Sequence, residues 1–288
     1  MASQRPYNTT AYRYPRERLI LVLTLLLVFL VIALTATATV CLSVVFVVGM
    51  VAFSYAITRS HHRALLQQAR QVTPQDTPAL ATLVTESVAR LQPGPVQVFV
   101  APSDTLNAYT FGLSFPKVVV LHSALLPVMD ADELRFVLGH ELGHMRLGHT
   151  WLNSLVGGMA GIPSPFVASA ILAMAFLWWN RACEYSADRP GLLACGQPHK
   201  AISALVKLAA GVDAFDRRRS PTESTPWEQA LRRIEAEDDH ALANLDEALS
   251  THPMTVRRIE QLRRYATTAE YRHLQARMER NVVRSEQR

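Results

Sequence analysis

The chain has 288 residues, of which 49% are hydrophobic and 18% are charged, and its formal net charge is +5. One long apolar stretch holds many of the hydrophobic residues, which favours a membrane protein with one soluble domain. The three cysteines give no disulfide framework and are typical of a reducing compartment. The sequence contains no nucleic-acid-binding motif, so attraction to anionic lipid headgroups explains the positive charge more simply. We therefore expect the lipid bilayer, and no nucleic acid, as a partner.

The first predicted element is the apolar stretch from Leu19 to Ile57, which spans 39 residues without a charge. A single straight helix of that length would measure about 58 Å, roughly twice the hydrocarbon core of a bilayer. The stretch therefore predicts a transmembrane helical hairpin over residues 19–57 that turns near residues 35–39. A cleaved signal peptide is the alternative, but the apolar run continues for a whole second span after any cleavage site.

Arginines flank this hairpin on both sides: Arg5, Arg13, Arg16 and Arg18 precede it, and Arg59, Arg63 and Arg70 follow it. Basic residues at both ends favour a cytoplasmic location for both ends. We expect residues 1–18 to form a basic cytoplasmic tail and residues 58–288 to form a domain that faces the cytoplasm. The predicted localisation is the cell membrane, with more than one crossing.

The remaining domain alternates helices with a few strands. A helix is expected from Thr73 to Leu91, and strands are expected over Val96–Ala101 and Lys117–Leu121. Two polar helices are expected near the C-terminus, over residues 227–248 and 254–284.

The central predicted helix carries the sequence His140-Glu141-Leu142-Gly143-His144. Asp130 followed by Glu133 is a capping-box pattern for its start. The two histidines lie four residues apart on one helical face, so both imidazoles can bind one metal ion. Glu141 is close enough to deprotonate a water on that metal without being a ligand. The pattern predicts one Zn²⁺ ion per chain, although a purely structural histidine pair is the alternative.

A zinc protease needs a third protein ligand, and Glu184 is the best candidate. Asp188 follows it by one helical turn and would suit an outer position, where it fixes the tautomer of a ligand histidine. Two solvated acids on an exposed helix are the alternative. Pro190 predicts that this second helix kinks or ends near Asp188.

The apolar region between the ligands, residues 152–179, is constrained by the metal. His144 and Glu184 must meet at one ion, so the region crosses the bilayer either twice or not at all. Two full spans need about 40 residues, whereas 28 are available. A hairpin that turns at residues 161–165 and either dips into the membrane or lies against it satisfies both limits, and a soluble core hairpin remains open.

With these residues the chain resembles the HtpX-type membrane zinc proteases. HExxH is followed by the pattern Arg-x-x-Glu-x-x-Ala-Asp, which here is Arg181, Glu184, Ala187 and Asp188. Two further stretches are similar to motifs of the family: Asn107-Ala108-Tyr109 ahead of a strand, and His252-Pro253 with Arg258 six residues after the histidine. The resemblance covers roughly residues 75 to 265. The chain departs from it between His144 and Glu184, where the family usually carries two full spans.

The resemblance implies an α+β, zincin-like metalloprotease domain, mostly helical with a small sheet. It implies a role for His252 or Arg258 in stabilising the oxyanion, without deciding between them. It also implies that an extended substrate lies along the edge strand near Asn107, Ala108 and Tyr109.

The expected function is zinc-dependent endopeptidase activity on polypeptides, largely independent of their sequence, in the clearance of misfolded membrane proteins. Two alternatives remain: a zinc-binding membrane scaffold or chaperone-like module that does not cleave, and a dedicated processing protease.

Overall fold

A computed structural model describes residues 11–38, 42–112, 116–150, 167–211 and 253–286. The helices in the described ranges are α1 (Glu17–Ala38), α2 (Leu42–Gln68), α3 (Pro78–Leu91), α4 (Leu125–Val128), α5 (Ala131–Leu147), α7 (Val167–Cys195), α8 (Pro198–Ala210), α11 (Pro253–Ala266) and α12 (Ala269–Glu286). The strands are β1 (Arg70–Gln71), β2 (Val96–Ala101), β3 (Ala108–Phe111) and β4 (Lys117–His122). The chain is mostly helical with a small mixed sheet, as predicted. The expected helix over residues 227–248 lies outside the described residues.

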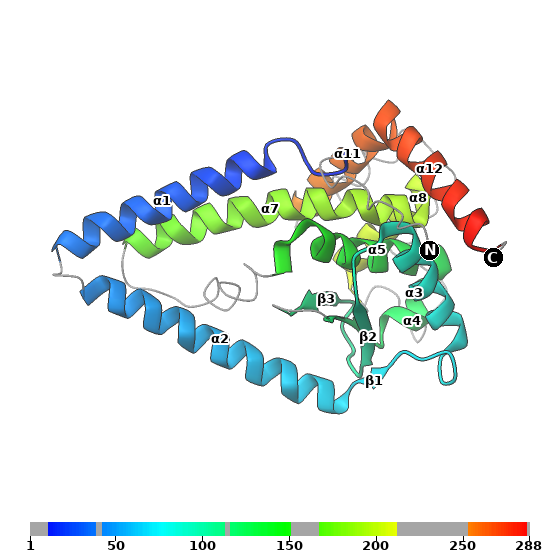
Figure 1. The fold of residues 1–288 in the computed structure, drawn as a ribbon, viewed down its shortest axis with the longest axis horizontal. Helices are drawn as coiled ribbons and strands as arrows, with labels where there is room; N and C mark the ends of the chain where they lie inside the picture. The colour runs from blue at the N-terminus through cyan, green and yellow to red at the C-terminus, as the bar shows by residue number, and fades with distance from the viewer. Residues whose placement is uncertain (1–10, 39–41, 113–115, 151–166, 212–252, 287–288) are drawn as a thin grey trace, which may run out of the picture.

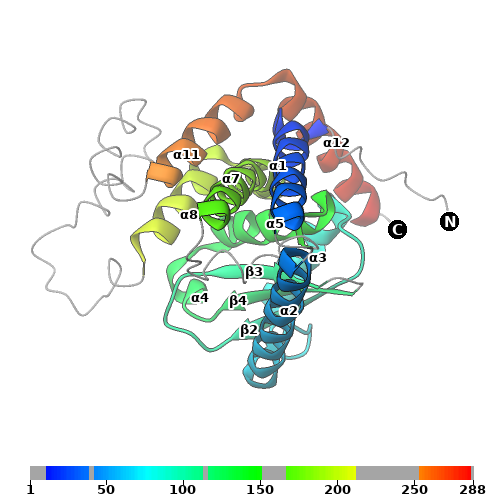
Figure 2. The same cartoon turned by 90° about the vertical axis from the view of Figure 1, so that its left-hand side faces the viewer.

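The sheet has the strand order β1-β2-β4-β3. Strands β2 and β4 run parallel, and β3 runs antiparallel to β4, with Ala108 opposite Leu121. Strand β3 is therefore an edge strand, and α5 lies between the sheet and α7 (Figures 1 and 2). This arrangement places the edge strand beside the helix that carries HExxH.

Helix α5 begins where the capping box predicts. The Asp130 side chain accepts hydrogen bonds from the backbone N–H groups of Asp132 and Glu133, and Glu133 Oε2 accepts one from the N–H of Asp130 at 2.8 Å. The expected apolar stripe of α5 is buried: Leu134, Val137, Leu138, Leu142 and Met145 all lie in the main core. The cap and the stripe together fix which face of α5 meets α7.

Helices α5 and α7 cross at two glycines of α5. A Cβ atom on Gly139 would lie 2.5 Å from Cβ of Ala194 and 3.0 Å from Cα of Gly191, and one on Gly143 would collide with Pro190. Only residues without a side chain let the two backbones approach this closely. The close crossing brings the histidines of α5 opposite Glu184 of α7.

Helix α7 corrects the expectation that the helix with Glu184 is separate from the apolar region before it and ends near Asp188. The structure has one helix of 29 residues, Val167–Cys195, that continues past Pro190. Proline removes one backbone hydrogen bond from a helix, and Pro190 packs closely on Gly143 of α5. The expected turn at residues 161–165 lies outside the described part.

Helix α3 also starts later than predicted, at Pro78 instead of Thr73. The N–H of Thr77 donates to the carbonyl of Thr73 at 3.0 Å, so residues 73–77 form a turn. Proline is favoured in the first turn of a helix, and it disfavours helical geometry at the residue before it. Thr77 accordingly has φ −138° and ψ 64°.

Helices α1 and α2 extend away from the domain, and the end of α7 that starts at Val167 lies beside α1 (Figure 1). Helix α1 is helical through Thr35–Ala38, where a turn was expected, and α2 begins at Leu42. Helix α2 continues past the expected boundary at residue 57 to Gln68. Within the described residues, one helix is long and apolar enough to cross a membrane, with a mean hydropathy of 2.7 over Glu17–Leu34.

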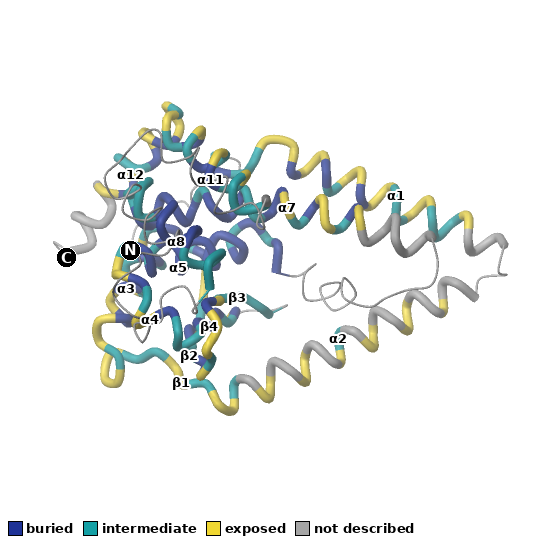
Figure 3. Tube along the Cα trace, turned by 180° about the vertical axis from the view of Figure 1, so that it is seen from behind, coloured by how far each residue is buried: buried dark blue, intermediate teal, exposed yellow. Residues whose placement is uncertain are grey.

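The exposed surface of these helices is apolar. In the described ranges, every exposed large hydrophobic side chain except Leu126 lies on α1, α2 or α7. Figure 3 shows the exposed faces of α1 and α2 in contrast to the buried centre of the domain. Soluble proteins rarely expose apolar patches of this extent.

Candidate metal centre

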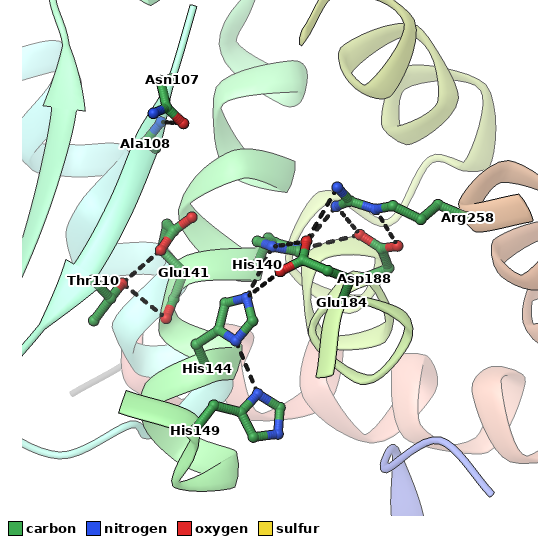
Figure 4. Close-up of polar contacts among 10 residues, drawn as sticks. All are labelled: Asn107, Ala108, Thr110, His140, Glu141, His144, His149, Glu184, Asp188 and Arg258. Atoms are coloured by element: carbon green, nitrogen blue, oxygen red, sulfur yellow. Dashed lines mark hydrogen bonds and ion pairs between the residues drawn. The ribbon is translucent and has the colours of Figure 1, made fainter. Parts of the chain in front are cut away.

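Three side chains from two helices meet at one point behind the edge strand. His140 and His144 of α5 and Glu184 of α7 offer ligand atoms that all lie within 4.8 Å of one another. The two Nε2 atoms are 3.1 Å apart, and each lies 3.4 Å from a different carboxylate oxygen of Glu184 (Figure 4). Two imidazoles and one carboxylate form a donor set that suits a catalytic zinc ion with an open fourth position.

The second nitrogen of His140 is held by Asp188. Its Nδ1 atom lies 3.0 Å from Oδ1 of Asp188, one turn after Glu184 on α7. Because Nδ1 is engaged, the remaining nitrogen, Nε2, is the one that faces the other ligands. An acid in the outer position predicted for Asp188 would make this contact.

Arg258 of α11 binds both acids. Its Nε and Nη2 atoms donate to the two carboxylate oxygens of Asp188 at 2.9 and 2.6 Å, and Nη1 lies 3.1 Å from Glu184 Oε2. This forked contact fixes the plane of the Asp188 carboxylate. Arg258 therefore organises the two acids on α7.

The electrostatics of the cluster are strongly coupled. Burial alone would raise the pKa values of Glu184 and Asp188, but the charge of Arg258 and the hydrogen bonds with His140 lower both. Burial would also lower the pKa of His140, but its hydrogen bonds with Asp188 and Glu184 outweigh burial and raise it to about 10. A metal ion that binds here must therefore displace a proton from His140.

His144 has a different second partner. Its Nδ1 atom lies 2.8 Å from Nδ1 of His149, which is buried. Gly148 ends α5 in the left-handed conformation, with φ 83°, directly before His149. Burial lowers the pKa of His149 to about 4, which favours its neutral form.

Glu141 points away from the ligand cluster, toward the edge strand. Thr110 Oγ1 of β3 donates to Glu141 Oε2 at 2.7 Å and also lies 3.2 Å from the backbone oxygen of Glu141 (Figure 4). The carboxylate and the three ligands line one cavity of about 280 Å³. Glu141 thus faces the same space as the ligands without joining them.

The cavity is also lined by Asn107, Ala108, Tyr109 and Arg258. Asn107 Oδ1 accepts a hydrogen bond from the N–H of Ala108 at 2.9 Å, which fixes the turn into β3. The structure thus brings together every candidate site residue except His252, which lies outside the described residues.

Two contacts in the site were not anticipated from the sequence. Thr110 shares a strand face with Ala108, since side chains two apart point the same way, and this was a usable signal. His149 follows a glycine at the expected helix end, but its direction depends on the left-handed turn at Gly148.

The comparisons with known proteins agree with this geometry. A model of peptidase family M48 matches residues 74–266. The chain is 30% identical over 210 residues to the plastoglobule-localized metallopeptidase 48 of Arabidopsis thaliana, and the match covers 67% of this chain and 58% of that protein. It is 25% identical over 262 residues to a protease HtpX homolog of Bifidobacterium longum, covering 78% of this chain and 83% of that one.

A protease HtpX homolog of Thermococcus kodakarensis is 28% identical over 235 residues, which cover 69% of this chain and 77% of the homolog. No solved structure matches the chain.

Proposed function

Because the chain belongs to peptidase family M48 and is an HtpX-like metalloprotease, we propose that it is a membrane-anchored zinc endopeptidase. Its substrates on this proposal are misfolded membrane proteins. The observation that carries the proposal is the convergence of His140, His144 and Glu184 at one point, with Glu141 facing the same cavity.

The three ligand residues would hold the ion through Nε2 of each histidine and the carboxylate of Glu184. Bound zinc would lower the pKa of a water molecule toward neutrality and polarise the substrate carbonyl. Asp188 and Arg258 keep His140 and Glu184 oriented. Asp188 contacts His140, Arg258 contacts Glu184, and Asp188 and Arg258 contact each other.

Glu141 acts as the general base in this proposal. It takes the proton of the attacking water and passes it to the leaving amine. Thr110 holds one carboxylate oxygen and leaves the other available for the proton. Since Thr110 belongs to β3, the strand that would bind substrate also orients the base.

Substrate would pair in an extended conformation with the outer edge of β3. Strand β4 occupies one side of β3, and no strand of the described chain occupies the other. Asn107, Ala108 and Tyr109 border the cavity at the start of this edge. Main-chain pairing tolerates many side chains, which suits an endopeptidase that clears misfolded polypeptides.

The oxyanion requires a donor besides the metal. The guanidinium of Arg258 directs Nε and Nη2 to Asp188 and Nη1 to Glu184. This engagement favours His252 over Arg258 as the donor to the oxyanion.

The anchor on this proposal is α1 with α2, and the part of α7 that begins at Val167 lies beside α1 at the membrane. The apolar exposed side chains of these helices and the arginines at both ends of the hairpin support this. A bilayer would cover surfaces that water leaves exposed.

The decisive test is Glu141→Gln in the full chain purified in detergent. Zinc content should remain one ion per chain, because Glu141 is not a ligand, while casein cleavage should fall below detection. Glu260→Gln, an exposed position on α11, is the matched control and should cleave like the wild type.

Residual cleavage by Glu141→Gln above that of a metal-free sample would contradict the assignment of the base. A wild-type protein that binds zinc but cleaves neither casein nor unfolded membrane proteins would instead favour the non-proteolytic scaffold.

A further inference from the structure

The segment before α1 packs against α5 and α7, the two helices that carry the candidate metal ligands. The N–H of Tyr14 donates to Ser186 Oγ at 2.9 Å, and Arg189 Nη1 donates to the carbonyl of Arg13 at 2.9 Å. Arg13 Nη2 in turn donates to the carbonyl of Leu147 at 2.9 Å, at the end of α5. These contacts join the segment before α1 to both helices that carry the ligands.

Glu17, the first residue of α1, is buried by this docking and is 1% exposed. Its carboxylate accepts a hydrogen bond from Ser186 Oγ and pairs with Arg13. Glu17 Oε1 also lies 3.4 Å from Nε2 of His149. Burying an acid at the start of an apolar helix costs free energy unless the acid is paired. Since an apolar residue would avoid this cost, we expect a function of the Glu17 carboxylate in the contacts that it makes.

His149 links this acid to the metal centre. Its Nδ1 atom lies 2.8 Å from Nδ1 of His144, whose Nε2 faces the other ligands. Nε2 of His149 makes no hydrogen bond of ordinary geometry with any described residue, and it faces Glu17 Oε1 at 3.4 Å. A continuous series of polar contacts therefore runs from Glu17 through His149 to His144.

Metal binding by His144 determines which atom donates and which accepts in each of these contacts. A histidine that binds a metal through Nε2 carries its proton on Nδ1, so His144 donates and Nδ1 of His149 must accept. The proton of neutral His149 is then on Nε2, where Glu17 is the acceptor that it faces. Without Glu17, the opposite tautomer of His149 would place two N–H groups against each other at the ligand.

We infer that His149 and Glu17 are positioning residues for the metal ligand His144, so that the first residue of the anchor helix helps to build the metal centre. The inference rests on the proposed zinc site. Glu17 lies outside the family match, which covers residues 74–266, whereas His149 lies within it. Asp188 and Arg258 perform the corresponding task for His140, and His149 and Glu17 perform it for His144.

The test measures metal affinity in the full chain in detergent, for wild type, Glu17→Leu, His149→Leu and His149→Asn. Zinc affinity is obtained by competition with a chelator, and the absorption spectrum of the Co²⁺ form reports the ligand geometry. Outer partners of a ligand typically contribute a factor of about 10–100 in affinity. We expect His149→Leu and Glu17→Leu, which has no acceptor atom, to lose about 10-fold or more, with an altered Co²⁺ spectrum.

His149→Asn should recover part of the loss, because its side-chain oxygen can take the place of Nδ1. Thr24→Val is the matched control on α1: it removes the hydrogen bond from Thr24 Oγ1 to the carbonyl of Ala175 at 3.3 Å and leaves the metal centre untouched. Its zinc affinity and Co²⁺ spectrum should equal those of the wild type.

A double-mutant cycle separates this inference from a general loosening of α1. Glu17→Leu added to His149→Leu should cost no further zinc affinity, because Glu17 acts through His149. An equal loss in both backgrounds, or wild-type affinity and spectrum for Glu17→Leu alone, would overturn the inference. Should Glu17→Leu fail to fold, equal zinc affinities for His149→Leu and wild type would overturn it instead. Absence of metal binding in the wild type would contradict the proposed function itself.

Discussion

Glu184 and Asp188 lie one helical turn apart on α7, yet their contacts assign them different tasks. Glu184 faces the Nε2 atoms of both histidines. Among the described residues, the polar partners of the Asp188 carboxylate are Nδ1 of His140 and the guanidinium of Arg258. A carboxylate that faces Nε2 can coordinate an ion there. A carboxylate on Nδ1 can only orient the ring.

Glu184→Ala should therefore lose most zinc affinity, while Asp188→Asn should weaken it by roughly 10–100-fold. Metal analysis after dialysis against a graded zinc buffer measures both. Glu260→Gln serves as the control for a carboxylate lost from the surface. Full zinc occupancy in Glu184→Ala would show that the third ligand is another residue.

The pKa shifts predict how stability depends on pH when zinc is removed. The pKa of His140 is raised from 6.5 to about 10, so protonated His140 stabilises the fold fully below about pH 6.5 and this contribution is lost as pH rises through 10. The lowered pKa values of Asp188 and Glu184 act oppositely, and their contribution is lost in acid.

Thermal unfolding in a chelator should thus show stability falling between about pH 6.5 and 10, and His140→Asn should flatten this decline. If wild type and His140→Asn decline in parallel over that range, the stabilising contacts of His140 are not those described here.

At the residue scale, the sequence predicted the pairs that depend on helical spacing, because spacing fixes the face of a helix. His140 with His144 and Glu184 with Asp188 were accessible in this way. Glu17 with His149 was not, because those residues are far apart in the chain and meet only through tertiary packing. The direction of Arg258 likewise depends on how α11 packs on α7.

At the scale of elements, the metal centre depends on the close crossing of α5 and α7. Gly139→Ala would place a Cβ atom 2.5 Å from that of Ala194 and 3.0 Å from the Pro190 oxygen. Overpacking of this kind typically costs about 1–3 kcal/mol, and we expect a comparable loss in the free energy of unfolding. Gly49→Ala, which would meet no atom within 4 Å, is the control and should not destabilise.

A second substitution, at Ala194 opposite Gly139, tests whether the loss comes from the helix crossing. Ala194→Gly removes the nearest obstacle, so the double variant should be less destabilised than the sum of the two single variants. Additive losses would mean that Cβ of Ala194 is not the main obstacle, and that the backbone of Pro190 and Gly191, 3.0 Å from the added Cβ atom, excludes a side chain at position 139.

The elements were predicted best where local signals were strong, as for the capping box of α5 and the strands β2 and β4. The continuity of α7 could not be predicted, because its composition changes from apolar to charged near Asn180 and Pro190 lies inside it. Packing against α1 on one part and α5 on the other keeps it a single helix. The entry into α1 was expected to belong to a tail, whereas Tyr12 lies in the main core.

At the scale of the whole molecule, the paths of α1 and α2 bear on how the protein sits in a membrane. Helix α1 starts at the domain and leads away from it, and α2 returns to the domain at β1 (Figure 1). If both helices cross the bilayer, the docked residues before Glu17 and the protease domain lie on the same side. The arginines at both ends of the hairpin favour the cytoplasm for that side.

We therefore predict that the N-terminus, the HExxH helix and the C-terminus all face the cytoplasm. A C-terminal fluorescent fusion should be bright and a C-terminal alkaline-phosphatase fusion inactive, with the same result for fusions at the N-terminus. The control is a phosphatase fusion truncated between Ala38 and Leu42, where the chain passes from α1 to α2, and this fusion should be active. An active phosphatase at the C-terminus would place the protease outside. The docking of Tyr14 and Glu17 on the domain would then require the N-terminus to be outside too, because both contact the ligand-bearing part of α7 at Ser186.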